Sequence, residues 1–144
     1  MILIKTMSKL TTLALLTAFC LIFNARADDA KTPPTLPPAS PKTDVTYVTD
    51  IKPIFDASCV KCHNGDRAKA RLHMDTLDGV LKGTKNGSII TAGNSAKSWI
   101  VLVTAHATDD DMTWMPPMGN KAGIKPLTSD QIGLIRAWID QGAK

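Results

Sequence analysis

Aromatic residues are scarce in this 144-residue sequence, which contains three Trp, three Phe and one Tyr, or 5% of all residues. Aromatic side chains supply much of the buried area in a small domain. With so few of them, the core would be thin unless something large and apolar other than side chains filled its middle. The length leaves no room for two cores, so we expect a single folded domain.

Long hydrophobic runs are also absent. The apolar run from Leu10 to Phe23 has 14 residues, whereas a helix that spans a bilayer needs about 20. Basic residues precede this run, and the small-x-small sequence Ala25-Arg26-Ala27 follows it, which is the pattern of a secretory signal. We therefore expect residues 1–27 to be a cleaved signal peptide and the mature chain to be periplasmic or otherwise exported, without stable membrane insertion. An uncleaved anchor is the alternative.

Once this segment is removed, the sequence has no large excess of either positive or negative charge. The full sequence has a net charge of +4, but residues 1–27 contain three basic and no acidic residues, which leaves 14 basic and 13 acidic groups. A net charge of +1 gives no case for nucleic acid or an anionic membrane as the partner.

Cysteine is scarce as well. Bulky Phe19 precedes Cys20 where a lipid attachment signal would have a small residue, so Cys20 is expected to leave with the signal peptide. The mature chain then keeps only Cys59 and Cys62. A disulfide between residues this close would constrain little of the chain, which excludes a disulfide-stapled scaffold. These two cysteines need another role.

Residues 28 to 44 contain five prolines among small and polar residues and show no apolar period, which predicts an extended linker. A disordered tail without a role is the alternative. The folded domain is expected at residues 45 to 144.

The hydrophobic pattern of this domain predicts an all-α fold with about four helices and long loops. The expected helices begin at Asp50, run from Asp75 to Lys82, run from Asn94 or Ser95 to about His106, and run from Thr128 to Gly142. Thr128 and Gln131 form a capping box, which nearly fixes the start of the last helix. The expected buried faces are Trp99, Ile100, Leu102 and Val103 on the third helix, and Ile132, Ile135, Trp138 and Ile139 on the last.

The segment Cys59-Val60-Lys61-Cys62-His63 has the form C-x-x-C-H. In this motif two thiols add to the vinyl groups of a haem and the adjacent imidazole binds the iron. Two residues between the cysteines let the chain turn once, so that both sulfurs reach neighbouring ring edges. The motif predicts one covalently attached haem c per chain, with His63 as an iron ligand. A haem would also fill the interior that the aromatic side chains leave thin.

A zinc site and a redox dithiol are the alternatives for these cysteines. A zinc site would need a second pair of ligands at comparable spacing, and only His73 and His106 remain. A thioredoxin-like dithiol would need a βαβ unit, which this helical sequence does not offer.

The second axial ligand decides whether the iron is closed for electron transfer or open for binding. The proline-stiffened segment Trp114–Gly119 offers two thioethers, and Met115 is the predicted ligand, with Met118 as the alternative. The remaining candidates are Met112, Met74, His73 and His106. Both histidines are expected to be solvated or hydrogen-bonded bystanders.

Several short motifs occur together in residues 45 to 144: Ile51-Lys52-Pro53-Ile54-Phe55, C-x-x-C-H, Leu72-His73-Met74-Asp75, Leu81-Lys82-Gly83, Ala92-Gly93 with Ser98, Met115-Pro116-Pro117, and Leu127-Thr128 leading to Trp138-Ile139-Asp140-Gln141-Gly142-Ala143. This combination resembles the planctomycete-type cytochrome c domain. The resemblance implies a small class I-like cytochrome c fold around one haem, with the first and last helices crossing near the haem edge. It also implies thioether bonds from Cys59 and Cys62, His63 as the proximal ligand and Met115 as the distal ligand.

We therefore expect a monomeric electron carrier that meets redox partner proteins. An enzyme is not expected, because no catalytic acid, base or nucleophile stands at a convincing spacing. The alternative is a haem module that binds or senses small ligands through an open or displaceable sixth site.

Overall fold

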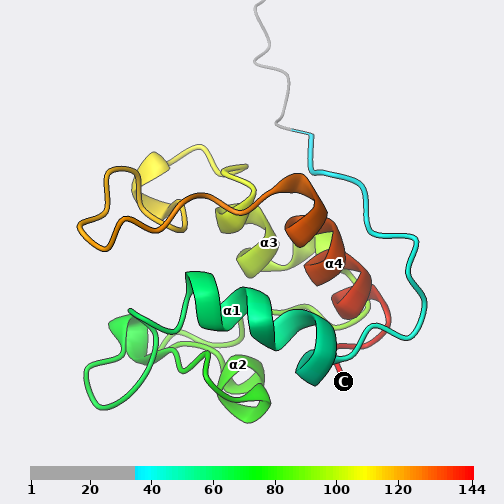
Figure 1. The fold of residues 1–144 in the computed structure, drawn as a ribbon, viewed down its shortest axis with the longest axis horizontal. Coiled ribbons are helices and arrows are strands. Elements are labelled where there is room, and N and C mark those ends of the chain that lie inside the picture. The colour runs from blue at the N-terminus through cyan, green and yellow to red at the C-terminus, as the bar shows by residue number, and fades with distance from the viewer. Residues whose placement is uncertain (1–34) are drawn as a thin grey trace, which may run out of the picture. The chain divides into compact units, whose positions relative to one another are not determined.

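The computed structural model of the protein describes residues 35–144, so the predicted signal peptide and the first part of the predicted linker lie outside the described residues. The described part contains four α-helices joined by long loops: α1 (Lys52–Ser58), α2 (Leu77–Lys82), α3 (Trp99–Thr104) and α4 (Ser129–Asp140) (Figure 1). No strand is present in this part, and the prediction of an all-α fold is confirmed for it. None of its helices has the length and apolar character needed to cross a membrane.

The first helical segment begins earlier than the sequence predicts. A π-helical turn, Tyr47–Ile51, precedes α1, and Thr46 rather than Asp50 is its N-cap. The Thr46 hydroxyl accepts a hydrogen bond from the Thr49 N–H at 3.3 Å, while the Asp50 carboxylate accepts one from the Thr46 N–H at 2.9 Å. The predicted start at Asp50 is therefore wrong, because Asp50 lies in the first turn and bonds back to the cap.

The start of α2 also differs from the prediction. Thr76 caps this helix by accepting a hydrogen bond from the Gly79 N–H at 3.1 Å, so that α2 begins at Leu77 rather than at Asp75. It ends as predicted before Gly83, which has a φ of +78° that favours glycine.

The third helical region is divided in two. Asn94 caps a 3₁₀ turn, Ser95–Lys97, and α3 itself begins at Trp99. Ile100 and Val103 are buried as predicted, but Leu102 is only partly buried and Trp99 is 47% exposed. Trp99 lines a cavity, which explains why an apolar residue at a helix start has so much exposed surface.

The last helix agrees with its prediction. The Gln131 N–H donates to the Thr128 hydroxyl at 3.3 Å, and the Thr128 N–H donates to the Gln131 side-chain oxygen at 2.9 Å, which completes the capping box. The predicted buried stripe is confirmed at Ile132, Ile135, Trp138 and Ile139.

Three of the few aromatic residues gather at one contact between the first helical segment and α4. The Phe55 ring lies edge-on to Trp138, with ring centroids 6.4 Å apart, and the Tyr47 ring lies 5.9 Å from Trp138. All three side chains are buried. The Trp138 indole N–H also donates to the Lys144 carbonyl at 2.9 Å, which holds the C-terminus against this cluster.

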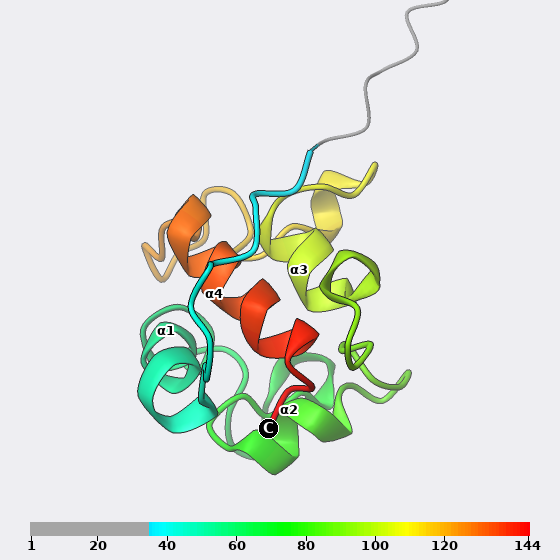
Figure 2. The same cartoon turned by 90° about the vertical axis from the view of Figure 1, so that its right-hand side faces the viewer.

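Residues 37–42, within the predicted linker, run along α4 (Figure 2). Three hydrogen bonds join them to the helix and its C-cap: the Ser40 N–H to the Gly133 carbonyl, the Arg136 guanidinium to the Pro37 carbonyl, and the Gln141 side-chain amide to the Lys42 carbonyl. A Cβ on Gly133 would lie 2.8 Å from the Pro38 carbonyl oxygen, so glycine permits this close approach.

Candidate haem-binding site

The C-x-x-C-H motif forms a turn directly after α1. Cys59 is the C-cap of that helix, and its N–H donates to the Phe55 carbonyl at 2.8 Å. The N–H groups of Cys62 and His63 both donate to the Cys59 carbonyl, at 3.1 and 3.0 Å. This single turn places both sulfurs and the imidazole on the wall of one cavity.

The segment 68–74 returns to the motif and fixes the histidine. The Lys69 N–H donates to the Cys62 carbonyl at 3.1 Å, and the Met74 N–H donates to the His63 carbonyl at 2.8 Å. The His63 Nδ1 atom lies 3.1 Å from the Lys69 carbonyl oxygen. Because a carbonyl can only accept, the proton of the neutral ring lies on Nδ1 and the Nε2 lone pair is left free for a metal.

Burial lowers the pKa of His63, since desolvation disfavours the imidazolium, and the bond to Lys69 opposes this shift only in part. The neutral form, which is the one that binds metals, is therefore favoured.

The cavity beside the motif has a volume of about 540 Å³, which is within the usual range of about 300 to 1,000 Å³ for cofactor pockets. Its lining is mostly apolar and includes Leu72, Met74, Ile89, Trp99, Ile100, Val103, Ile124 and Leu127. Two thiols and an imidazole with a free Nε2 line the same space. These residues fit a haem, and the cavity lies in the interior that the scarce aromatic residues do not fill.

The loop between α3 and α4 brings Met115, Pro116 and Pro117 to this cavity. Figure 1 shows this loop and the loop after α1 on the same side of the described unit. Met118 is 68% exposed and does not line the cavity. The structure thus brings Met115 together with the motif and leaves Met118 outside.

The other predicted candidates are distributed differently. Met74 is buried and lines the cavity beside the motif, whereas Met112 is 84% exposed. His73 and His106 do not line it. His106 instead stacks on Trp114.

The loop that carries Met115 is anchored to α3. The Met115 N–H donates to the Val103 carbonyl at 3.0 Å, and the Trp114 indole N–H donates to the Thr108 carbonyl at 3.3 Å. The anchoring role of Trp114 is not among the features predicted from the sequence. A tryptophan beside the Met-Pro-Pro segment is the one signal that could have indicated it.

Neither alternative for the cysteines gains support. Cys59 and Cys62 are free thiols, and burial, followed by repulsion from Cys62, raises the pKa of Cys59 to about 12. Redox-active dithiols instead lower the pKa of the attacking cysteine. Within residues 35–144, no group of three or more His, Cys, Asp or Glu side chains could hold a metal ion.

Comparison with known proteins agrees with this site. Residues 59–119 match the family model described as Planctomycete cytochrome C, which spans the C-x-x-C-H motif and the Met-Pro-Pro segment. No curated protein and no solved structure matches the chain. The match covers less than half of the chain and supports the planctomycete-type cytochrome c domain predicted from the sequence, and such a domain implies binding of haem c.

Proposed function

We propose that the protein is an exported, mono-haem c-type cytochrome that transfers single electrons between redox partner proteins. Cys59 and Cys62 would attach the haem through thioether bonds, and His63 and Met115 would be its axial ligands. One observation supports this most strongly: the motif and Met115, from distant parts of the sequence, line the same mostly apolar cavity.

The bound haem supplies a one-electron couple. The residues of the chain tune and protect it. His63, held by the Lys69 carbonyl, presents Nε2 in a fixed orientation. The soft Met115 thioether would favour the reduced state of a bound haem and raise its potential, and the mostly apolar lining would limit its contact with water.

No acid, base or nucleophile is needed for this role, so we propose a carrier rather than an enzyme. Export rests on the signal-like sequence of residues 1–27, and the near-neutral mature chain gives no reason to propose nucleic acid as a partner. We also propose that the carrier is a monomer.

The test is to co-express the protein with a cytochrome maturation system and to record spectra of the oxidised and reduced forms. The wild type and Met118→Ala should show the weak sulfur-to-iron band near the red end, and Met115→Ala should lack it. Met118→Ala is a matched control, because it removes an exposed thioether from the same loop. Retention of the band in Met115→Ala would show that the ligand assignment is wrong.

Carbon monoxide separates the carrier from a sensing module. The ferrous wild type should not bind it, because Met115 closes the sixth site, whereas Met115→Ala should bind it readily. Ready binding by the wild type would favour the module with a displaceable sixth ligand.

A further inference from the structure

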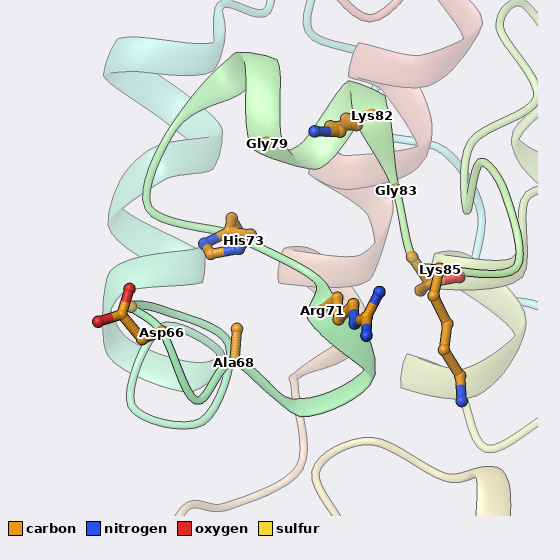
Figure 3. Close-up of a pocket in the computed structure, with 10 residues that line it drawn as sticks. Asp66, Ala68, Arg71, His73, Gly79, Lys82, Gly83 and Lys85 are labelled. Atoms are coloured by element: carbon orange, nitrogen blue, oxygen red, sulfur yellow. The ribbon is translucent and has the colours of Figure 1, made fainter.

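A second cavity, of about 550 Å³, lies on the other side of the segment 68–74 and is lined by basic side chains (Figure 3). Its basic residues are Arg71, His73, Lys82 and Lys85, and the one acidic residue among its lining residues is Asp66. In Figure 3, Asp66 lies on the side away from Arg71 and Lys85. We call this cavity the cationic hollow.

The basic groups of the hollow are not neutralised from within the described part of the chain. The ion pairs found in residues 35–144 are Lys42–Asp50 and Lys52–Asp56. The side chains of Arg71, Lys82 and Lys85 have no hydrogen-bond or ion-pair partner there. Three basic side chains without a partner and a single carboxylate among the lining residues give the hollow a net positive charge, which favours an anion.

The segment 68–74 separates the hollow from the haem-binding cavity. Lys69, Ala70, Leu72 and Met74 line the haem-binding cavity, and Ala68, Arg71 and His73 line the hollow. Thr84 lines both cavities. A charge bound in the hollow would therefore lie behind the same segment that holds the His63 imidazole.

The backbone places Arg71 on the hollow side at some conformational cost. Ala70 and Arg71 have φ values of 57° and 56°, a left-handed conformation that non-glycine residues rarely adopt. The Lys85 N–H donates to the Ala70 carbonyl at 3.1 Å. This bond joins the backbone segment of Arg71 to that of Lys85. Strained positions of this kind cluster at binding sites.

Two glycines hold Lys82 and its neighbours in place. A Cβ on Gly79 would lie 2.5 Å from the His73 carbonyl oxygen, so α2 packs closely on the segment that carries His73. A Cβ on Gly83 would lie 2.4 Å from the Gly87 carbonyl oxygen, which closes the turn that carries Lys85. The backbone segments that carry these basic side chains are therefore closely packed against one another.

We propose that the cationic hollow binds a small polyvalent oxyanion of the phosphate class. The Arg71 guanidinium can bond two oxygens of such an ion, Lys82 and Lys85 add positive charge around the cavity, and the concave shape suits a small ion better than a flat protein surface. We further propose, on the basis of the proposed haem function, that the bound anion lowers the reduction potential. A negative charge near the haem stabilises the oxidised iron, and linkage then makes the oxidised protein bind the anion more tightly.

Calorimetric titration of the haem-loaded protein with inorganic pyrophosphate at low ionic strength tests the site. We expect one saturable site, and we expect Arg71→Gln and Lys85→Gln each to weaken binding by about tenfold or more. Lys97→Gln is the matched control, because it removes the same charge from an exposed turn outside the hollow, and it should weaken binding less than twofold. Circular dichroism checks that each variant is folded.

Absence of saturable binding in the wild type, or equal weakening in Lys97→Gln, would overturn the site. Binding of polyglutamate without binding of pyrophosphate would also overturn it, in favour of a protein docking surface.

Redox titration tests the coupling. Saturating pyrophosphate should lower the wild-type potential and leave that of Arg71→Gln unchanged, whereas an unchanged wild-type potential would overturn the coupling. A colourless protein that binds pyrophosphate would contradict the proposed haem function while leaving the anion site intact, so the two failures are distinguishable.

Discussion

The His106 imidazole lies parallel to the Trp114 indole, with ring centroids 4.6 Å apart and 3° between the ring planes. The stack joins the residues after α3 to the residue directly before Met115. The His106 Nε2 atom is buried without a hydrogen-bond partner in the described structure, so stacking rather than polar contact holds this ring. The contact is therefore a brace for the loop that presents the proposed distal ligand.

Trp114→Leu should loosen this loop without removing Met115. An aromatic pair contributes about 0.5–1.5 kcal/mol, so the concentration of added imidazole that displaces the methionine should fall by about twofold to tenfold. Loss of the red-end sulfur band during an imidazole titration measures the effect. Met112→Ala changes an exposed residue of the same loop and should titrate like the wild type. If Trp114→Leu also titrated with imidazole like the wild type, the stack would not brace the loop.

The aromatic contact between the first helical segment and α4 should dominate the stability of the fold. Trp138 is fully buried, and Trp138→Ala should lower the free energy of unfolding by about 3–5 kcal/mol. Trp138→Phe keeps a ring against Phe55 but loses the bond to the Lys144 carbonyl, so it should cost clearly less. Denaturant unfolding of the haem-loaded proteins provides the comparison. Equal losses in the two variants would mean that the hydrogen bond, not ring packing, matters most.

The capping box of α4 gives a smaller effect. Thr128→Ala removes the acceptor for the Gln131 N–H and should lower the free energy of unfolding by about 1 kcal/mol. Thr128→Ser keeps the hydroxyl and should be nearly neutral. Thermal unfolding at fixed pH measures both, and a serine variant as unstable as the alanine variant would argue against the cap.

Asp50 should make stability depend on pH in the acid range. Its hydrogen bond with Lys42, followed by the one from the Thr46 N–H, lowers its pKa below the ordinary value of 3.8. A carboxylate whose pKa is lowered in the folded state contributes stability above its ordinary pKa, and this contribution is lost as the pH falls through the folded value.

Asp50→Asn should therefore melt below the wild type at pH 7, and the difference should shrink as the pH falls below about 4 and disappear below the lowered pKa of Asp50. Lys42→Gln removes the ion pair but leaves the bond from the Thr46 N–H, so its melting temperature should lie between those of the other two proteins. A difference between wild type and Asp50→Asn that is independent of pH would contradict this account.

Features encoded by neighbouring residues could be predicted from the sequence. The capping box and buried stripe of α4 depend on spacing within one helix, and the C-x-x-C-H turn depends on five consecutive residues. The start of the first helical segment could not be predicted, because Thr46 and Asp50 are both good capping residues and the contact of Tyr47 with Trp138, which favours the earlier turn, is a tertiary contact.

Features that depend on tertiary contacts could not be predicted. The sequence favours Met115 but leaves Met118 as an alternative, and only the folded loop places Met115 at the cavity and Met118 in solvent. Trp99 fits a helical stripe, yet the cavity exposes it. The cationic hollow depends on the left-handed backbone of Ala70 and Arg71, which no residue type there indicates.

Extraction of the purified, matured protein with acidified acetone tests the central claim most directly. If Cys59 and Cys62 hold the haem through thioether bonds, the red pigment should remain with the precipitated polypeptide and the acetone should stay colourless. A colourless protein, or pigment that passes into the acetone, would contradict a covalently attached haem at this site.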